Sequence, residues 1–346
     1  MTLALCVVNP HGAWQTSDTR LFDANLGKPI PDPSTKQFTF MTPDGAGTIA
    51  YTGIGWLSPD QHVSGVIFKL LRGMSADVES TLAAIAAFAT DRIAPIALKH
   101  GVGHTFVACG FRNRVPWLAA ISNDATALYH DRVLRVGNPK AKSISAHFVP
   151  WFFKDTGTGV SVVAGMHGSV SNSDYEILKR IMTKRPERAD EFLRLLAEIT
   201  RRTGKHAPNY ISEESYGVRI NPTGRAFPPH AFTWGKPADQ GAMPKSLLWG
   251  LDPSSAAEGL SVGIQAAAGD EARIKSAFVA ALRTMMEISV GQRVVHNKTG
   301  RRGTVVNSFA DPDGDVNLVS VRWDGDAKAQ SADRADFAIL PPGVKT

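Results

Sequence analysis

The sequence has little cysteine, with only Cys6 and Cys109 in 346 residues. Each lies in an apolar run typical of a strand, so no disulfide framework is indicated and a reducing compartment is favoured. No charged segment precedes an apolar stretch at the N-terminus, as a signal peptide would require. The most apolar long stretch, Leu82 to Ala89, is far too short to span a bilayer. We therefore expect a cytoplasmic protein without a membrane segment.

Metal-binding and nucleotide-binding patterns are also lacking. The ten histidines are dispersed, and neither an HExxH motif nor paired Cys/His spacing occurs. Isolated glycine pairs such as that in Gly101-Val102-Gly103 lack the strand–loop–helix context of a phosphate-binding loop. We expect no metal and no cofactor.

Composition is that of an ordinary globular chain. Apolar residues make up 43% and charged residues 20%, which is unlike a disordered chain. The net charge of +6 would attract anions in general. The basic residues are scattered, however, and the densest stretch, 179–202, is typical of the polar face of helices. Nucleic-acid binding as the main function is therefore disfavoured.

Strands and helices are predicted in separate blocks. Pro43-Asp44-Gly45 marks a hairpin turn, Ser58-Pro59 is a helix start signal, and Pro186 and Gly204 interrupt and end a helical block. Strands are expected over 2–9, 13–21, 37–41, 48–53, 104–111, 115–122, 147–153, 160–164, 216–220 and 226–232, and helices from 58, around 78–89, within 174–203 and over 270–288. This order favours an α+β fold of stacked layers over alternating βαβ units.

The C-terminal segment has a different pattern. From Val290 onward, five short strands separated by turns, among them 298–300 and 324–325, suggest a small β-barrel. The segments 291–295 and 300–305 are similar to small SH3-like barrels of the KOW type, and modules of this kind bind RNA or proteins. Eight basic and seven acidic residues nearly cancel over 289–346. That balance favours a protein-docking or assembly role over RNA binding.

A threonine follows the initiator methionine. Methionine is usually removed before a small residue, and Thr2 would then carry a free α-amine beside its hydroxyl. A threonine hydroxyl is a poor nucleophile without a base in hydrogen-bonding reach. An α-amine, with a pKa of about 8, can be that base. Many proteins begin Met-Thr by chance, so the case for a catalytic Thr2 depends on the residues that follow it.

Several segments after Thr2 resemble the catalytic β-type subunits of the proteasome and their bacterial relatives. Ser17 to Arg20 resembles the Asp-x-Arg segment of that family, with Asp18 at the family's spacing from Thr2. Lys36 resembles the lysine that opens the next strand. Ala50 to Gly53 is similar to the segment that ends at the oxyanion-hole glycine. Later in the chain, Gly165 to Ser169 resembles the Gly-x-Gly-Ser turn, and Ser212 resembles the serine that closes the active-site network.

The resemblance implies a set of catalytic roles. Thr2 would attack a scissile carbonyl, and its own amine would take and return the proton. The Lys36 ammonium would favour the deprotonated forms, and Asp18 would keep that ammonium charged and oriented. The N–H of Gly53 would stabilise the oxyanion. Ser169 and Ser212 would hydrogen-bond around the amine.

The resemblance also implies an architecture. It covers roughly residues 2–232 and implies a four-layer αββα sandwich of the N-terminal-nucleophile (Ntn) hydrolase type, acting on a peptide or amide substrate within a homo-oligomer. Residues 233–288 would form a linker with a helical extension, and 289–346 the small barrel. The barrel would be the route to any protein partner.

Other interpretations of the same residues stay open. The lysine follows a proline-rich insertion at Pro29 to Pro33, Asn209 stands where the family has aspartate, and Glu213 and Glu214 stand where it has glycines. Asp18 could be a solvated strand end, Lys36 a surface lysine, Gly53 a simple strand end and Ser169 a helix cap. The alternative function is a catalytically silent proteasome-like scaffold whose barrel is the interaction surface.

Overall fold

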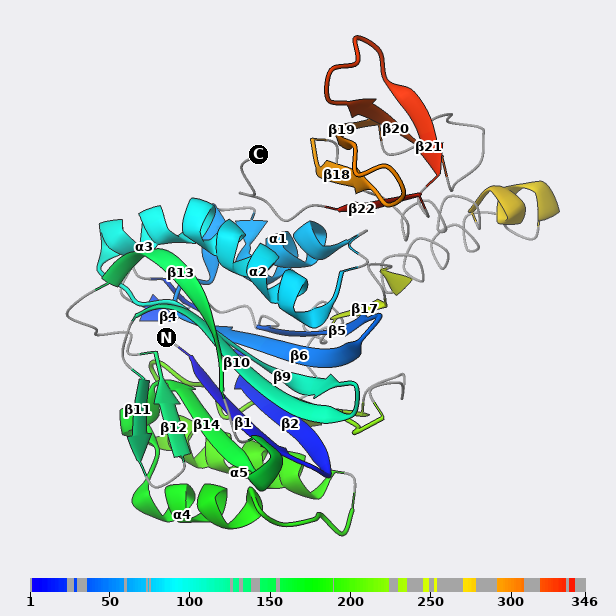
Figure 1. Cartoon of the computed structure of the whole chain (residues 1–346). Helices are drawn as coiled ribbons and strands as arrows, with labels where there is room; N and C mark the ends of the chain where they lie inside the picture. Colours follow the sequence, from blue (N-terminus) through cyan, green and yellow to red (C-terminus); the bar gives the residue numbers. More distant parts are fainter. Residues whose placement is uncertain are drawn as a thin grey trace. The chain divides into compact units, whose positions relative to one another are not determined.

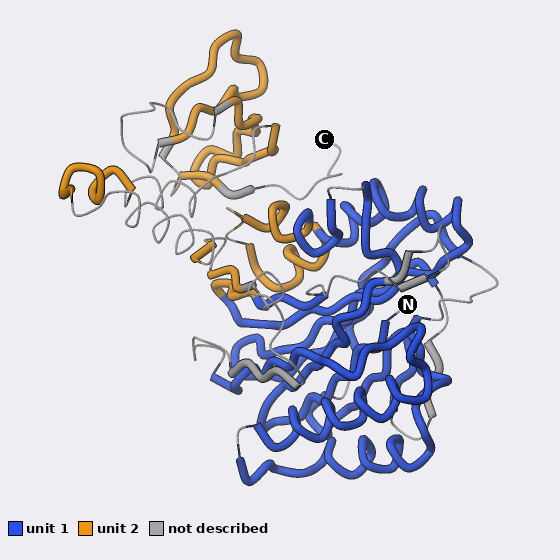
Figure 2. Tube along the Cα trace, turned by 180° about the vertical axis from the view of Figure 1, so that it is seen from behind, with its two compact units in different colours: residues 1–39, 44–66, 85–245 blue, residues 40–43, 67–84, 246–346 orange. Residues whose placement is uncertain are grey.

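The structure is a computed structural model of the whole chain. It describes residues 2–346 apart from 24–27, 30–35, 59–60, 73, 75, 125–126, 131–132, 138–143, 154–155, 189, 224–229, 235–244, 249–251, 254–269, 278–290, 308–317, 334–335 and 340–346. The chain divides into two compact units (Figure 2): the first comprises Met1–Thr39, Asp44–Val66 and Ile85–Lys245, and the second Phe40–Pro43, Ile67–Ala84 and Ser246–Thr346. Mixed helix and strand content confirms the expected α+β class.

A seven-stranded sheet contains the N-terminal strand near its centre (Figure 1). Its strands, in spatial order, are β11 (Ala127–His130), β12 (Val133–Val136), β14 (Val160–Gly165), β1 (Leu3–Asn9), β2 (Gly12–Asp18), β15 (Ser215–Ile220) and β16 (His230–Trp234). β12 and β14 run parallel, and the other neighbouring strands run antiparallel. All seven residues of β1 are buried, which explains why its first six residues, Leu3 to Val8, are all apolar.

A six-stranded sheet is the second large sheet. Its strands, in order, are β13 (Ile144–Phe152), β10 (Val115–Asp124), β9 (Thr105–Arg112), β6 (Gly45–Thr52), β5 (Gln37–Thr42) and β17 (Lys245–Leu248). Asn113 and Arg114 join β9 to β10 with φ values of 49° and 66°. Positive φ at both central residues is the geometry of a tight hairpin turn that matches the strand twist, and asparagine tolerates it well.

The two sheets of the first unit pack on each other through a buried polar contact as well as apolar side chains. Gln15 on β2 donates to the Val107 carbonyl on β9 at 2.8 Å and accepts from the Thr48 hydroxyl at 3.1 Å. Nearby, Cys6 and Cys109 are both free and buried. Burial, together with a hydrogen bond to Cys109, raises the pKa of the Cys6 thiol well above its usual value.

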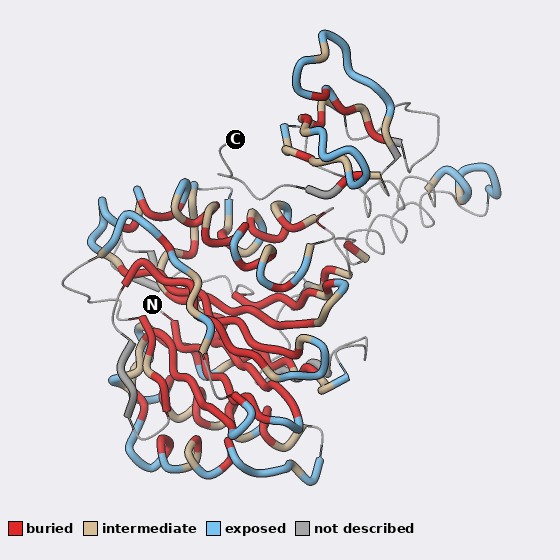
Figure 3. The backbone as a smooth tube through the Cα atoms, viewed as in Figure 1, coloured by how far each residue is buried: buried red, intermediate tan, exposed pale blue. Residues whose placement is uncertain are grey.

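Two helices, α4 (Asn172–Ile181) and α5 (Glu191–His206), cover the other face of the seven-stranded sheet (Figures 1 and 3). Leu3, Leu5 and Val7 alternate along β1 and enter the core shared with these helices. Trp14 on β2 packs on Phe192 of α5, with ring centroids 4.7 Å apart. The predicted break at Pro186 is confirmed, since the chain between α4 and α5 is not helical there.

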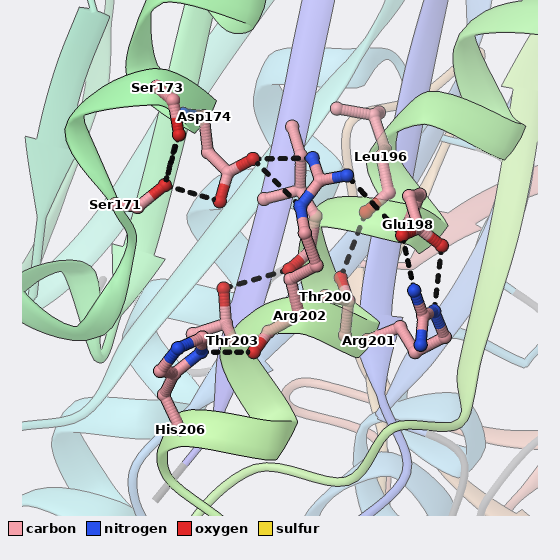
Figure 4. A network of polar contacts seen from close by, with 11 residues as sticks. Ser171, Ser173, Asp174, Leu196, Glu198, Thr200, Arg201, Arg202, Thr203 and His206 are labelled. Carbon is pink, nitrogen blue, oxygen red and sulfur yellow. Dashed lines mark hydrogen bonds and ion pairs between the residues drawn. The ribbon is translucent and has the colours of Figure 1, made fainter.

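A charged network ties α4 to α5 (Figure 4). Ser171 caps α4 by accepting from the Asp174 N–H at 3.2 Å, and its hydroxyl donates to the Asp174 carboxylate at 2.7 Å. Arg202 on α5 pairs with the same carboxylate, whose side chain is 4% exposed. Arg202 also bonds Glu198 one turn earlier, at 3.3 Å. The two helices are thus joined by the Arg202–Asp174 ion pair as well as by their apolar faces.

The helical segment before β9 covers part of the six-stranded sheet. α2 (Val78–Phe88) continues through a π-helical turn (Ala89–Ile93) into α3 (Ala94–His100), which ends at Gly101 with φ 61°. The Thr90 hydroxyl accepts from Phe148 N–H of β13 at 2.9 Å. The run Val78–His100 is long and apolar enough to cross a membrane by length and composition, but 56% of that window is buried inside the protein, as in an ordinary core helix.

The second unit contains a five-stranded antiparallel sheet. In spatial order its strands are β21 (Gln330–Asp333), β20 (Leu318–Trp323), β19 (Arg302–Asn307), β18 (Arg293–His296) and β22 (Phe337–Ile339). Val294, Val305, Val321 and Trp323 are buried within it. Among the described residues this C-terminal segment has five strands, the number that its sequence pattern predicts. In the same unit, Arg72 after α1 pairs with the buried Asp252 at 2.5 Å.

The remaining elements are short. They are β3 (Phe22–Asp23), β4 (Lys28–Pro29), β7 (Trp56–Ser58), β8 (Gln61–His62), α1 (Val63–Leu71) and the 3-10 turns Thr156–Thr158 and His167–Ser169. β3 pairs with β4, and β7 pairs with β8.

Three sequence predictions are wrong. Ser58 does not begin a helix: it ends β7, and α1 begins at Val63, because β7 and β8 form a small ribbon first. Gly204 does not end a helix, since α5 continues to His206. Strands β11 and β12 were not anticipated. The helix predicted over 270–288 is observed at 271–277, and the rest of it lies outside the described residues.

Candidate active site

Strand pairing brings the first residues of the chain to Asp18. Thr2 directly precedes β1, and Asp18 ends β2, which runs antiparallel to β1 with Ala4 opposite Ser17. The Asp18 carboxylate accepts from the Leu3 N–H at 2.9 Å. Lys36 directly precedes β5 of the other large sheet. The start of one strand, the end of its neighbour and the start of a strand in the second sheet therefore meet.

Lys36 links the other two predicted residues. Its Nζ lies 2.8 Å from Thr2 Oγ1 and 3.1 Å and 3.2 Å from the two carboxylate oxygens of Asp18. It also donates to the Arg20 carbonyl. An ammonium has three N–H donors and no acceptor. Each of those donors therefore has an acceptor, and the Thr2 hydroxyl oxygen is one of them.

Asp18 is held by backbone donors as well as by Lys36. Besides Leu3, the N–H groups of Arg20 and Ser212 lie 3.1 Å and 3.3 Å from its Oδ2. These contacts fix the orientation of the Asp18 carboxylate toward Lys36.

The three residues are buried together. Thr2 is 2% exposed, and Asp18 and Lys36 are fully buried. Burial lowers the pKa of Lys36, and the nearby Arg20 charge lowers it further, while Asp18 opposes both effects. A lysine in these surroundings gives up a proton more readily than one in water. Because its partner Asp18 lies in the same buried site, the ion pair is only weakly screened by solvent.

Gly53 follows β6 beside the N-terminal residue. Its φ is 108°, and a Cβ at this position would lie 2.5 Å from the Gly103 carbonyl oxygen and 2.9 Å from the His104 Cα. Only glycine adopts this backbone without strain in so little space. The preceding residue, Thr52, donates its hydroxyl to the Thr2 carbonyl at 3.3 Å. The segment that resembles an oxyanion loop is thus adjacent to Thr2.

The Thr2 carbonyl has a second anchor in the turn after β14. It accepts from the Met166 N–H at 3.1 Å. Gly165 has φ 86°, and a Cβ there would lie 2.1 Å from the Thr2 carbonyl oxygen. Glycine at this position therefore lets the turn approach Thr2. The Thr2 carbonyl is held between Thr52 of β6 and the turn after β14.

The two predicted serines are placed differently. Ser212 joins the site: its hydroxyl accepts from the Thr19 N–H at 3.0 Å and donates to the Glu214 carbonyl at 2.7 Å. Ser169 is half-buried in the 3-10 turn His167–Ser169. Within the described part of the chain, no hydrogen bond joins its hydroxyl to Thr2. It is not a helix cap either, because Ser171 caps α4.

Two departures from the family pattern leave the cluster intact. Lys36 reaches Thr2 and Asp18 although it follows the insertion at Pro29 to Pro33. Asn209 is exposed, and Ser212 bonds to Thr19 and Glu214 instead. An aspartate at position 209 is therefore not needed to orient Ser212.

Sequence reasoning missed three contributors to this site: the Arg20 carbonyl, the Thr52 hydroxyl and the imidazole of His104 behind Gly53. Backbone carbonyls carry no sequence signal. Thr52 lies inside the matching segment, so its neighbour Gly53 could have drawn attention to it. Among the described residues, no group of three His, Cys, Asp or Glu side chains could hold a metal ion, and the expectation of no cofactor stays a prediction.

Comparison with known proteins gives fold-level similarity only. No family model and no curated protein matches the sequence. Solved structures do match. Two of them are Anbu proteins. One is a Gly-1 mutant from Hyphomicrobium sp. strain MC1, with 14% identity, a TM-score of 0.42, and coverage of 69% of this chain and 89% of that chain. The other, described as an ancestral beta-subunit, is from Yersinia bercovieri, with 11% identity, a TM-score of 0.40, and coverage of 68% and 88%.

Proposed function

We propose that this chain is a threonine hydrolase of peptide or amide bonds, with Thr2 as its N-terminal nucleophile. The observation that carries the proposal is the 2.8 Å contact from Lys36 Nζ to Thr2 Oγ1, made by a lysine that also contacts Asp18. Because Lys36 donates to the Thr2 oxygen, the hydroxyl proton of Thr2 needs another acceptor. The α-amine of the same residue, once Met1 is removed, would be that acceptor.

The proposed reaction has two halves. In the first, Thr2 Oγ attacks the scissile carbonyl carbon while its proton passes to the Thr2 amine. The oxyanion is stabilised by the Gly53 N–H, and the departing amine takes the proton, which leaves an ester on Thr2. In the second, water attacks the ester, and its proton passes through the same amine to Thr2 Oγ. The sum is one bond hydrolysed to a carboxylic acid and an amine.

The Lys36 and Asp18 pair would act electrostatically. A cation next to Thr2 Oγ favours the alkoxide that develops during attack. Asp18 would keep Lys36 in place through both carboxylate oxygens. Ser212 would act one step further out, through its N–H to Asp18.

The architecture that we propose follows from the same elements. α4 and α5, the seven-stranded sheet, the six-stranded sheet and α3 would form the four layers of an αββα sandwich built mainly from residues 2–232, to which β17 (Lys245–Leu248) adds an edge strand from the following segment. Residues 233–288 would be the linker, and the five strands of 289–346 a small SH3-like barrel that docks a protein partner. We also propose that the chain assembles as a homo-oligomer.

The test is turnover by a Thr2→Ala variant on a panel of fluorogenic peptides and amides. We expect turnover to fall to background in Thr2→Ala and to persist in Thr2→Ser, which keeps both hydroxyl and amine. Intact-mass measurement of both variants and the wild type checks that Met1 is absent. Unchanged turnover in Thr2→Ala, or retention of Met1 in active protein, would refute the proposal. A wild type with Met1 removed but no turnover would support the silent-scaffold alternative.

A further inference from the structure

His104 contacts the backbone that follows the proposed oxyanion glycine. Its Nδ1 lies 3.0 Å from the Ile54 N–H. The Gly53 Cα is packed against it so closely that a Cβ would lie 3.1 Å from the same nitrogen. The Gly53–Ile54 peptide is therefore held by a side chain rather than by strand pairing, because β6 ends at Thr52.

The imidazole can act only as a neutral acceptor here. Accepting from the Ile54 N–H requires a lone pair on Nδ1, so the ring proton resides on Nε2. His104 is fully buried, and burial lowers its pKa to about 3. The acceptor is thus present at every pH at which an α-amine could serve as a base.

The ring itself is rigidly supported. The backbone N–H of His104 donates to Asn123 Oδ1 at 2.8 Å, which fixes the main chain that carries the ring. Tyr51 stacks on the ring with centroids 5.5 Å apart and an interplanar angle of 20°, and Phe106 meets it edge-on at 4.6 Å. Because these contacts hold the imidazole in place, its hydrogen bond from Ile54 can also hold the Gly53–Ile54 segment in place.

One nitrogen of this ring has no evident structural use. His104 Nε2 is buried and has no hydrogen-bond partner among the described residues. A buried polar atom without a partner opposes folding, and such groups call for another explanation. An apolar aromatic ring would fill the same space without that cost, but it could not accept from Ile54.

We propose that His104 is a positioning residue, which fixes the Gly53–Ile54 peptide so that the Gly53 N–H faces the developing oxyanion. Gly53 is anchored on one side by Thr52, which belongs to β6 and pairs with Thr105, and on the other side by the bond from Ile54 to His104. Without the second anchor, Gly53 could leave its φ of 108°, and the compensating rotation about Thr52 would turn the Thr52–Gly53 peptide, which carries the Gly53 N–H. This inference rests on the proposed hydrolase function.

The kinetic test compares three variants. His104→Phe keeps the aromatic packing but removes the acceptor, and we expect kcat to fall about 100-fold, with KM within about threefold, as for loss of an oxyanion donor. His104→Asn places an amide oxygen near the Nδ1 position, and we expect it to recover kcat to within about tenfold of wild type. Phe111→Leu, the control for altered packing, changes a buried ring seven residues further along the chain, on β9, and is expected to keep wild-type kcat within about threefold.

If His104→Phe does not fold, NMR spectroscopy of the wild type provides the test. Long-range proton–nitrogen NMR of the full wild-type chain should show a neutral His104 with its proton on Nε2, and the Ile54 amide should be protected from hydrogen exchange. A proton on Nδ1, or rapid exchange at Ile54, would overturn the inference. So would wild-type kcat in a folded His104→Phe protein while Thr2→Ala is inactive. Absence of turnover in the wild type would instead refute the hydrolase itself.

Discussion

At the residue scale, the main feature is the buried ion pair between Lys36 and Asp18. Both side chains are fully buried, at 3.1 Å from each other. Removing two ions from water costs several kcal/mol each, and their attraction repays that cost only when every donor and acceptor is satisfied. Here the Lys36 donors and the Asp18 oxygens are satisfied by one another, by Thr2 and by backbone groups.

We predict that breaking this pair on one side destabilises the fold more than removing both charges. Lys36→Met leaves Asp18 buried without its counter-ion, and we expect a loss of about 3–5 kcal/mol in the free energy of unfolding. The double variant Lys36→Met with Asp18→Asn should recover part of this loss, although both variants should lack turnover. Urea unfolding at neutral pH measures both. Equal losses in the two variants would contradict this account of the pair.

A second residue-scale prediction concerns acid stability. The pKa of His104 is lowered by burial from 6.5 to about 3. Between these values, the unfolded chain binds a proton that the folded chain does not, so His104 makes stability fall as pH decreases from 6.5 toward 3. We expect the stability advantage of wild type over His104→Asn to shrink by roughly 3 kcal/mol between pH 6.5 and pH 4. Urea unfolding of both proteins across that pH range measures this difference in stability. A difference that does not change with pH would contradict a neutral, buried imidazole.

At the element scale, Gly204 shows packing overriding helix propensity. It lies inside α5, where alanine is normally better than glycine by about 1 kcal/mol. A Cβ at Gly204 would lie 2.8 Å from the Ser212 carbonyl oxygen, and Ser212 contacts Asp18. The glycine thus allows the helix to approach Ser212, whose N–H contacts Asp18.

We predict that Gly204→Ala destabilises the protein by about 1–3 kcal/mol and lowers turnover by displacing Ser212. Gly65→Ala in α1 is the matched control, since a Cβ there meets nothing within 4 Å, and we expect it to be neutral or stabilising. Thermal unfolding and peptide turnover of both variants provide the comparison. If Gly204→Ala stabilised the protein, the close contact between Gly204 and Ser212 would not limit the side chain at position 204, and this prediction would be wrong.

The joint between α4 and α5 gives another prediction at this scale. Asp174 accepts from its cap Ser171 and from Arg202, and its side chain is 4% exposed. Asp174→Ala should therefore cost about 2 kcal/mol through lost charged hydrogen bonds. Glu176→Ala removes a carboxylate that is 69% exposed and pairs with Lys179 on the same helix, and it should cost under about 1 kcal/mol. Equal effects in chemical denaturation would refute a structural role for the Asp174 network.

At the scale of the whole molecule, the proposed homo-oligomer has a candidate contact surface. Leu98 on α3 and Val149 and Phe152 on β13 are 46%, 51% and 42% exposed. α3 and β13 are also in contact with one another. Exposed apolar side chains on adjoining elements are typical of surfaces that a second copy covers.

We predict that the full chain sediments as an assembly, and that Val149→Lys with Phe152→Lys shifts it to a smaller species. Val115→Lys, at a residue 63% exposed at the start of β10, adds one charge outside this surface and should leave the assembly unchanged. Sedimentation velocity over a range of concentrations separates these cases. A wild-type monomer at all concentrations would refute the homo-oligomer, and an unchanged mass in the double variant would refute this surface.

Much of the fold could be predicted from local patterns. Strands such as 105–112 and 115–124 follow from apolar runs bounded by turn residues, and α5 follows from a stripe of Phe192, Leu193, Leu196 and Ile199. β11 and β12 were missed because each has only four residues, and because they join the sheet through the pairing of β12 with the later strand β14. Ser58 was misassigned because its start signal is equally compatible with a strand end.

By itself, the sequence determined the chemistry available: a threonine able to carry both nucleophile and base, and the order of residues that could surround it. Those properties belong to residue types and to their spacing. Only the tertiary structure decided that Lys36, after an irregular insertion, meets Thr2 and Asp18, that Ser169 lies apart from Thr2, and that His104 supports Gly53. Each of these depends on how two sheets pack, and packing is set by contacts between residues far apart in the chain.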